Sequence, residues 1–281
     1  DPESSALRQT LAKTYGVEPE QVFVGNGSDE VLALAFQTFF CQPKPLLMPA
    51  ISYSFYPVYC KLYDIAYRTV ALNDHWQIAL EAFDADNGGV VFANPNAPTG
   101  HGHPRQAIAR LLERITESVV LVDEAYVDFG GESAIPLIDD HPNLLVTGTL
   151  SKSRSLAGLR VGYAIGSREL IDGLERVKNS FNSYPIDMLA SEVAIASLED
   201  DEHFRACCER VVATREWTRQ QLEALGFEVL PSQTNFLFVR HSERNGATIF
   251  SELRERGILV RHFDKDGLRD FLRISIGTDD E

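Results

Sequence analysis

Lys152 is the residue whose position first suggests chemistry. It follows a predicted strand over residues 144–147, in the sequence Thr149-Leu150-Ser151-Lys152. Ligands of open α/β sheets bind at strand ends, where a lysine amine can serve as a covalent attachment point. Arg160, eight residues later, could hold a phosphate through two parallel hydrogen bonds. Taken singly, each is more often a solvated or salt-bridged surface residue, so the motifs that end other predicted strands decide the interpretation.

Asp123 ends a second predicted strand, directly after Val120-Leu121-Val122. The simplest role for such an aspartate is to cap the following turn. A carboxylate at a strand end is also what a pyridine nitrogen needs in order to stay protonated, and the protonated ring then withdraws electrons. Asp123 is therefore a candidate both for a turn cap and for a partner of a pyridine ring.

Two further motifs end predicted strands. The segment 94–100, Asn-Pro-Asn-Ala-Pro-Thr-Gly, is rich in turn-forming residues. The segment 25–30, Gly-Asn-Gly-Ser-Asp-Glu, opens a predicted helix, and the amides of Gly27, Ser28 and Asp29 would favour a phosphate there. This glycine pattern matches neither a Walker loop nor the dinucleotide fingerprint, and an ordinary helix cap is the alternative.

The elements that must position these motifs alternate between short apolar strands and helices. Strands are predicted over 22–24, 46–48, 66–71, 90–93, 119–122, 144–147 and 160–165, with helices over 4–15, 29–40, 53–62, 104–115 and 168–181. This order predicts an α/β fold with a mostly parallel sheet in a large domain, residues 1–185. Helices over 187–198, 202–225 and 247–256 and strands over 227–230, 235–239, 258–261 and 271–276 predict a smaller α+β C-terminal domain, residues 186–281.

Composition narrows the class of protein. The net charge of −15 argues against a nucleic-acid partner. No apolar run is long enough to span a membrane, so we expect a soluble protein of the cytoplasm. The cysteines, Cys41, Cys60, Cys207 and Cys208, match no metal-ligand spacing and are expected to be buried free thiols. His101 and His103 lie close together without a third ligand nearby, so no metal site is expected.

Taken together and in this order, the motifs resemble those of the pyridoxal-phosphate-dependent aminotransferases of fold type I, most nearly the histidinol-phosphate aminotransferases. The resemblance runs from Tyr15-Gly16 to Leu272-Arg273-Ile274-Ser275. It implies pyridoxal 5'-phosphate as cofactor and a homodimer. It also implies transfer of an amino group between histidinol phosphate and 2-oxoglutarate, giving imidazole acetol phosphate and glutamate in histidine biosynthesis.

The same resemblance assigns roles to individual residues. Lys152 resembles the Schiff-base lysine, Asp123 the partner of the pyridine nitrogen, and Tyr126 the tyrosine that binds the ring hydroxyl. The remaining roles are those of the aromatic residue stacked on the ring, the phosphate site and the substrate anion site. Tyr53 resembles the stacked aromatic residue. The phosphate site is represented by Ser28, Asp29, Ser151 and Arg160. The substrate anion site is represented by Arg273 and Arg261.

The sequence departs from the family in two respects. The family commonly has asparagine before Pro-Thr-Gly, whereas this chain has Ala97, and Asn96 or Asn94 is expected to replace it at the ring hydroxyl. The family's N-terminal segment and last helix are expected to lie outside this sequence. Alternatives to the implied reaction are transamination of aromatic amino acids, a lyase such as threonine-phosphate decarboxylase, and, least favoured, a non-catalytic binding module.

Overall fold

The computed structural model describes all 281 residues and contains two separate sheets. The first has seven strands in the order β1-β7-β6-β5-β4-β2-β3. All are parallel except β7, which runs antiparallel to both neighbours. The strands are β1 (Val22–Asn26), β2 (Leu46–Pro49), β3 (Tyr67–Val70), β4 (Val90–Ala93), β5 (Val120–Asp123), β6 (Leu144–Thr149) and β7 (Val161–Gly166). The predicted α/β fold with a mostly parallel sheet is confirmed.

Helices cover both faces of this sheet, which is why the inner strands β2, β4 and β5 are buried and mostly apolar, whereas the edge strand β3 is largely exposed. On β5, Val120 and Val122 face one core and Leu121 faces the other. The first core includes residues of α1 (Ser5–Tyr15), α4 (Arg105–Arg114) and α6 (Met188–Glu199); the second includes α2 (Gly27–Ala35), α3 (Tyr56–Leu62) and α5 (Arg168–Lys178). Because side chains alternate along a strand, Asp123 shares the face of Leu121, beneath α2 and α3.

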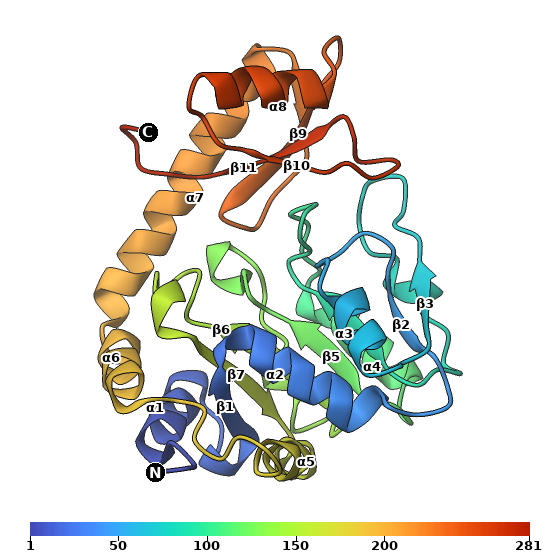
Figure 1. Cartoon of the computed structure of the whole chain (residues 1–281), viewed down its shortest axis with the longest axis vertical. Helices are drawn as coiled ribbons and strands as arrows, with labels where there is room; N and C mark the ends of the chain where they lie inside the picture. The colour runs from blue at the N-terminus through green and yellow to red at the C-terminus, as the bar shows by residue number, and fades with distance from the viewer.

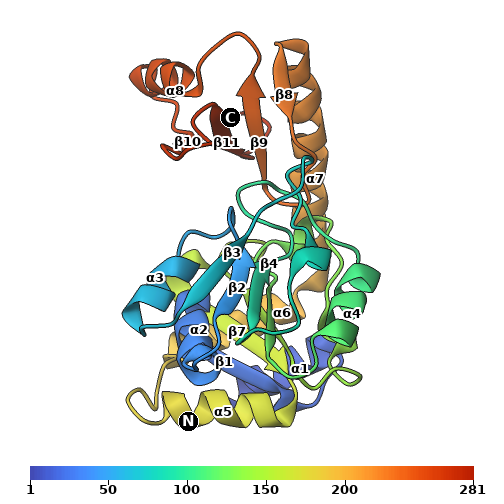
Figure 2. The same cartoon turned by 90° about the vertical axis from the view of Figure 1, so that its right-hand side faces the viewer.

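The second sheet is antiparallel, in the order β10-β11-β9-β8, and lies beyond one end of the first (Figures 1 and 2). Its strands are β8 (Phe227–Val229), β9 (Phe236–His241), β10 (Arg261–His262) and β11 (Phe271–Ser275). α8 (Gly246–Glu255) packs on one face. The other face meets Ile51 and Trp76 of the first part of the chain. The 24-residue helix α7 (Asp201–Ala224) runs along the molecule between the two parts.

Two sequence expectations need correction. The strand predicted over 258–261 is observed only as the two-residue strand β10, Arg261–His262, and the apolar Ile258 and Leu259 before it are solvent-exposed. α6 was expected in the smaller domain, yet its Ala190 and Ala194 are buried in the core of the large sheet with Leu7 and Leu11 of α1. The packing therefore puts the division between the two parts near the start of α7 rather than at residue 185.

Candidate active site

A cavity opens at the carboxyl ends of the parallel strands, where the sequence motifs were expected to meet. It gathers residues from the ends of β4, β5 and β6 and from the start of α2. Eight of the predicted residues line it: Ser28, Asp29, Tyr53, Asp123, Tyr126, Ser151, Lys152 and Arg160. Segments separated by more than a hundred positions in the sequence are thus brought to one place.

Asp123 is buried at the floor of this cavity. The hydroxyl of Tyr56, on α3, donates to its Oδ2 at 2.9 Å, and the amide of Ala125 donates to Oδ1 at 3.2 Å. Burial nevertheless raises the pKa of Asp123 to about 6, because two neutral donors do not replace the water that the carboxylate has lost. A cation that reached this carboxylate would stabilise its charged form.

Glu124, the next residue, is also buried but turns away from the cavity. It accepts hydrogen bonds from the Ser133 hydroxyl at 2.6 Å and the Ala134 amide at 2.5 Å. Burial raises the pKa of Glu124 to about 8. Its contacts tie the end of β5 to the segment around residue 133, which fixes the backbone that carries Asp123.

The start of α2 lies beside Arg160 at the cavity. Asn26 precedes the helix but makes no side-chain cap bond, so the opening amides receive no acceptor from it. Gly27 leaves the space that the Arg160 guanidinium fills: a Cβ there would lie 2.4 Å from Nη2. Gly162 is equally restricted, since its Cβ would lie 2.4 Å from the backbone of Gly27 and Ser28. The ordinary N-cap interpretation is therefore not supported.

Asp29 connects two other residues of the cavity. Its Oδ2 lies 3.1 Å from Nη2 of Arg160, and its Oδ1 accepts the hydroxyl of Tyr53 at 2.9 Å. Asp29 thereby holds the side chains of Arg160 and Tyr53 near the start of α2. The Arg160–Asp29 pair is partly exposed, so its contribution to stability is small, and an incoming anion can compete for the guanidinium.

Lys152 has no carboxylate partner and projects over the ring of Tyr126, with Nζ 5.5 Å from the ring centroid. Tyr126 in turn meets Phe236 of the small sheet edge to face, at 5.2 Å and 86°. The guanidinium of Arg273 also packs on Phe236, with Cζ 4.9 Å from the centre of its ring. Arg273 thus lies outside the cavity lining but is connected to it through two aromatic rings.

Arg261 and Arg273 are cross-strand neighbours on β10 and β11. Nearby arginines have carboxylate partners, Arg240 with Glu228 and Arg269 with Asp264, whereas Arg261 and Arg273 form no ion pair. The Nε of Arg273 is buried without any hydrogen-bond partner. Two like charges opposite each other destabilise a sheet, and an anion between them would remove that cost. Arg261, on the edge strand, is exposed.

The structure places neither Asn96 nor Asn94 in the cavity lining, where one of them was expected to replace the family's asparagine. Asn96 is fully buried: its amide donates to the Ile51 carbonyl and the Thr99 hydroxyl, both at 3.0 Å, and its oxygen accepts the Ser52 hydroxyl. The side-chain nitrogen of Asn94 donates to the His103 carbonyl, and its side-chain oxygen accepts the His103 backbone amide. Neither lines the cavity; Ala97 does. Both asparagines shape the turn, and Tyr126 is left as the predicted partner of a ring hydroxyl.

The sequence did not reveal Tyr56 and Phe236 as site residues. Tyr56 binds Asp123 from the far side, and Phe236 lies between Tyr126 and Arg273. The available signal for Tyr56 was its place three residues after Tyr53, one helical turn later. Phe236 had none, because it reads as an ordinary apolar residue of a strand and its role depends on how the two sheets meet.

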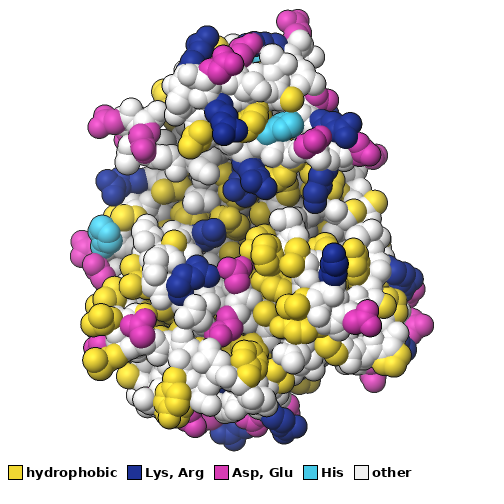
Figure 3. All heavy atoms as spheres, in the orientation of Figure 1, with side chains coloured by type: hydrophobic (Ala, Val, Ile, Leu, Met, Phe, Trp, Pro, Cys, Tyr) yellow, Lys and Arg dark blue, Asp and Glu magenta, His cyan; other side chains and the backbone are white.

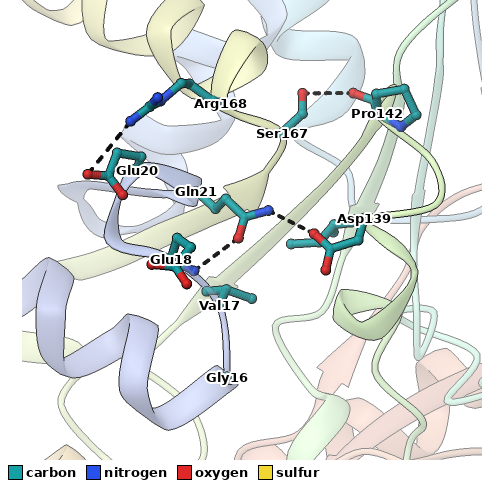
Figure 4. Close-up of a pocket in the computed structure, with 10 residues that line it drawn as sticks. Gly16, Val17, Glu18, Glu20, Gln21, Asp139, Pro142, Ser167 and Arg168 are labelled. Carbon is teal, nitrogen blue, oxygen red and sulfur yellow. Dashed lines mark hydrogen bonds and ion pairs between the residues drawn. The ribbon is translucent and has the colours of Figure 1, made fainter.

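A second hollow lies at the opposite, amino-terminal edge of the large sheet (Figure 4). Its polar groups already bind one another: Gln21 donates to Asp139 at 3.1 Å, and Arg168 lies 3.7 Å from Glu20. No lysine, buried carboxylate or unpaired arginine faces it. We assign it no function.

Comparison with known proteins decides the family. The family model described as aminotransferase class I and II matches residues 1–281. The chain belongs to this aminotransferase family. It is 75% identical over 281 residues to the histidinol-phosphate aminotransferase of Chromohalobacter salexigens, covering all of this chain and 80% of that protein.

Solved structures agree with this fold. The histidinol-phosphate aminotransferase of Clostridium acetobutylicum superposes with a TM-score of 0.92 at 22% identity, covering 100% of this chain and 86% of that one. That of Sinorhizobium meliloti, in complex with pyridoxal-5'-phosphate, gives 0.90 at 24% identity, covering 99% and 78%. The aminotransferase thus has the fold type I architecture that its motifs predicted. Its membership of the aminotransferase class I and II family supports pyridoxal 5'-phosphate as its cofactor.

The cavity of this aminotransferase has the features that the cofactor requires. Its phosphate needs amides and a guanidinium, and Gly27 and Gly162 let Arg160 and β7 lie close against the start of α2, where Ser28, Ser151 and Arg160 line the cavity. Its protonated ring nitrogen needs a carboxylate, and Asp123 is a buried one that forms no ion pair within the chain. Its aldehyde needs an amine, and Lys152 is the only lysine in the lining. The residues therefore fit the group.

No helix of the structure is both long and apolar enough to cross a membrane.

Proposed function

We propose that this aminotransferase exchanges an amino group between histidinol phosphate and 2-oxoglutarate, forming imidazole acetol phosphate and glutamate. The observation that carries the substrate assignment is Arg273, whose buried Nε has no partner and whose guanidinium forms no ion pair. Both proposed substrates bring an anion, a phosphate or a carboxylate, that a guanidinium can bind through two hydrogen bonds. The 75% identical relative bears the name of this activity.

We further propose how the residues of the cavity divide the work. The amides that open α2, with Ser151 and Arg160, hold the cofactor phosphate. Tyr53 stacks on the ring, Tyr126 binds its hydroxyl, and Asp123 binds its nitrogen as a carboxylate. When bound, the cofactor supplies a reactive aldehyde and a ring that takes up electron density.

Lys152 has two tasks in this proposal. Its amine holds the cofactor between turnovers and then, once displaced by the substrate amine, carries the proton from the substrate Cα. Its position over the Tyr126 ring, free of any carboxylate, leaves the amine able to swing between these tasks. The reaction alternates two half-reactions in one site, so its kinetics are expected to be ping-pong.

A second copy of the chain is part of the proposal. Exposed apolar side chains gather on two helices of the large domain: Val58 and Leu62 on α3, and Met188 and Leu189 on α6. Figure 3 shows hydrophobic side chains gathered over these helices on the face that it draws. Apolar patches of this kind mark protein interfaces. We infer that a homodimer covers them, and that the enzyme works in the cytoplasm.

The proposal is tested with a substrate panel on the full-length protein loaded with cofactor. Histidinol phosphate should be the preferred amino donor to 2-oxoglutarate, with glutamate as product. Phenylalanine and tyrosine test the aromatic alternative, and threonine phosphate tests the lyase. Preference for an aromatic amino acid, or release of carbon dioxide without glutamate, would contradict the assignment.

A further inference from the structure

Arg215 is a buried arginine of α7 for which the site described so far gives no role. Its exposure is only 5%. Nη1 donates to the carbonyl oxygens of Phe129, at 2.9 Å, and Thr234, at 2.8 Å, while Nε binds Glu216 at 3.1 Å. Burying a guanidinium is unfavourable unless its N–H groups find acceptors. The two carbonyls are therefore strongly held to Arg215 in the folded protein.

The two carbonyls belong to segments from different parts of the molecule. Phe129 lies three residues after Tyr126, in the short turn Val127–Phe129 that follows the end of β5. Thr234 lies two residues before Phe236, at the start of β9. Gln233 adds one more contact between the same segments, because its side chain donates to the Gly130 carbonyl at 2.7 Å. Its backbone amide donates to the Gly100 carbonyl at 2.8 Å, in the turn that ends the segment 94–100.

These contacts fix two aromatic rings against each other. Tyr126 meets Phe236 edge to face at 5.2 Å, and Arg273 lies against Phe236 at 4.9 Å. Tyr126 belongs to the cofactor cavity, and Arg273 is the proposed anion-binding residue. The distance between cofactor and substrate anion thus depends on how Phe129 and Thr234 are held, and Arg215 holds both.

We propose that Arg215 is a positioning residue for substrate selection: through Phe129 and Thr234 it sets the placement of Arg273 relative to the cofactor cavity. The proposal rests on the proposed function, because it assumes that Arg273 binds the substrate phosphate. It predicts that losing Arg215 weakens binding of a phosphorylated amine much more than binding of the same amine without phosphate. General damage to the fold would weaken both alike.

The test compares the dissociation constants of histidinol phosphate and histidinol by calorimetry. It uses cofactor-loaded, full-length protein carrying Lys152→Ala, so that turnover does not interfere. Arg215→Met and Arg215→Lys are added to this background. The preference for the phosphorylated amine should fall about tenfold or more in Arg215→Met, equivalent to about 1.4 kcal/mol. It should fall less in Arg215→Lys, which keeps the charge and can still donate from its single nitrogen.

Arg219→Met is the matched control, one turn along α7. Arg219 pairs on the surface with Glu216 and Glu223 and touches neither segment, so the preference should stay unchanged. If Arg215→Met does not fold, Gln233→Leu and Phe236→Leu decide, because each interrupts the same path at another point. An unchanged preference in the folded variants overturns the inference. If the Lys152→Ala background alone binds both amines equally, the proposed function itself fails.

Discussion

At the scale of single residues, the account depends on charges that are buried or unpaired in the absence of a ligand. Asp123 carries a pKa near 6 although two donors bind it. Arg273 carries a buried Nε without an acceptor. A folded protein keeps such groups at a cost in stability. That cost is explained if a pyridine nitrogen binds Asp123 and a substrate anion binds Arg273.

Because burial raises the pKa of Asp123, the free energy of unfolding of the cofactor-free protein should depend on pH. Below about pH 4 the carboxyl group is protonated in both the folded and the unfolded chain, and no penalty arises. Above about pH 6 it is ionised in both, and the raised pKa of Asp123 costs the cofactor-free protein roughly 1–3 kcal/mol. Asp123→Asn should therefore raise the free energy of unfolding of cofactor-free protein at pH 8, but not at pH 4.

Denaturant unfolding at the two pH values measures this effect. The same variant should lose several orders of magnitude in turnover with the cofactor still bound, because a neutral amide cannot hold the ring nitrogen protonated. A variant that is both less stable at pH 8 and near normal in turnover would mean that Asp123 only caps its turn.

Arg273→Lys tests the anion site. A lysine keeps the charge but cannot bind a carboxylate or phosphate through two parallel hydrogen bonds. Losing that contact should cost on the order of 2–4 kcal/mol of transition-state stabilisation, or roughly 30- to 1000-fold in kcat/KM. Single-turnover kinetics of each half-reaction, with the absorption of the bound cofactor as a check on cofactor binding, measure it. Unchanged rates with both substrates would show that the anion binds elsewhere.

At the scale of elements, the phosphate site depends on close contact between β7 and the start of α2. A Cβ on Gly162 would lie 2.4 Å from backbone atoms of Gly27 and Ser28, so Gly162→Ala must displace the helix start. We expect a loss of about 1–3 kcal/mol in stability and clearly weaker cofactor binding, measured by equilibrium dialysis. Gly158→Ala, in the loop just before β7, is the control, because nothing lies within 4 Å of a Cβ there.

Much of this element structure is predictable from the sequence. The buried strands of the large sheet are predictable because their residues are mostly apolar, and polar motifs after β1, β4, β5 and β6 indicated the site. The strand at 258–261 was overestimated because its apolar residues are exposed in the structure. The type of Asn96 suggested a ligand, whereas its hydrogen bonds are made to Thr99 within its own turn and to Ile51 and Ser52 in the loop after β2. Contacts between the two sheets, such as Phe236 with Tyr126, leave no local pattern to read.

At the scale of the whole molecule, the proposed dimer places apolar residues of α3 and α6 between two copies. Leu62→Lys with Leu189→Lys should weaken association, because each leucine is about 70% exposed in one chain and would be buried between two. Sedimentation measures the change. Leu225→Lys with Leu259→Lys is the control, since these leucines are equally exposed but belong to the smaller part. A wild-type protein that sediments as a fully active monomer would contradict the dimer.

The central claim is that Lys152 carries the cofactor, and chemical reduction tests it most directly. Borohydride treatment of the cofactor-loaded protein makes the bond between pyridoxal phosphate and its lysine permanent, and digestion with mass spectrometry then locates it. We predict the added mass of one reduced cofactor on the peptide containing Lys152, and none in Lys152→Ala. Labelling of another lysine in the wild-type protein, or label retained in Lys152→Ala, would contradict the account.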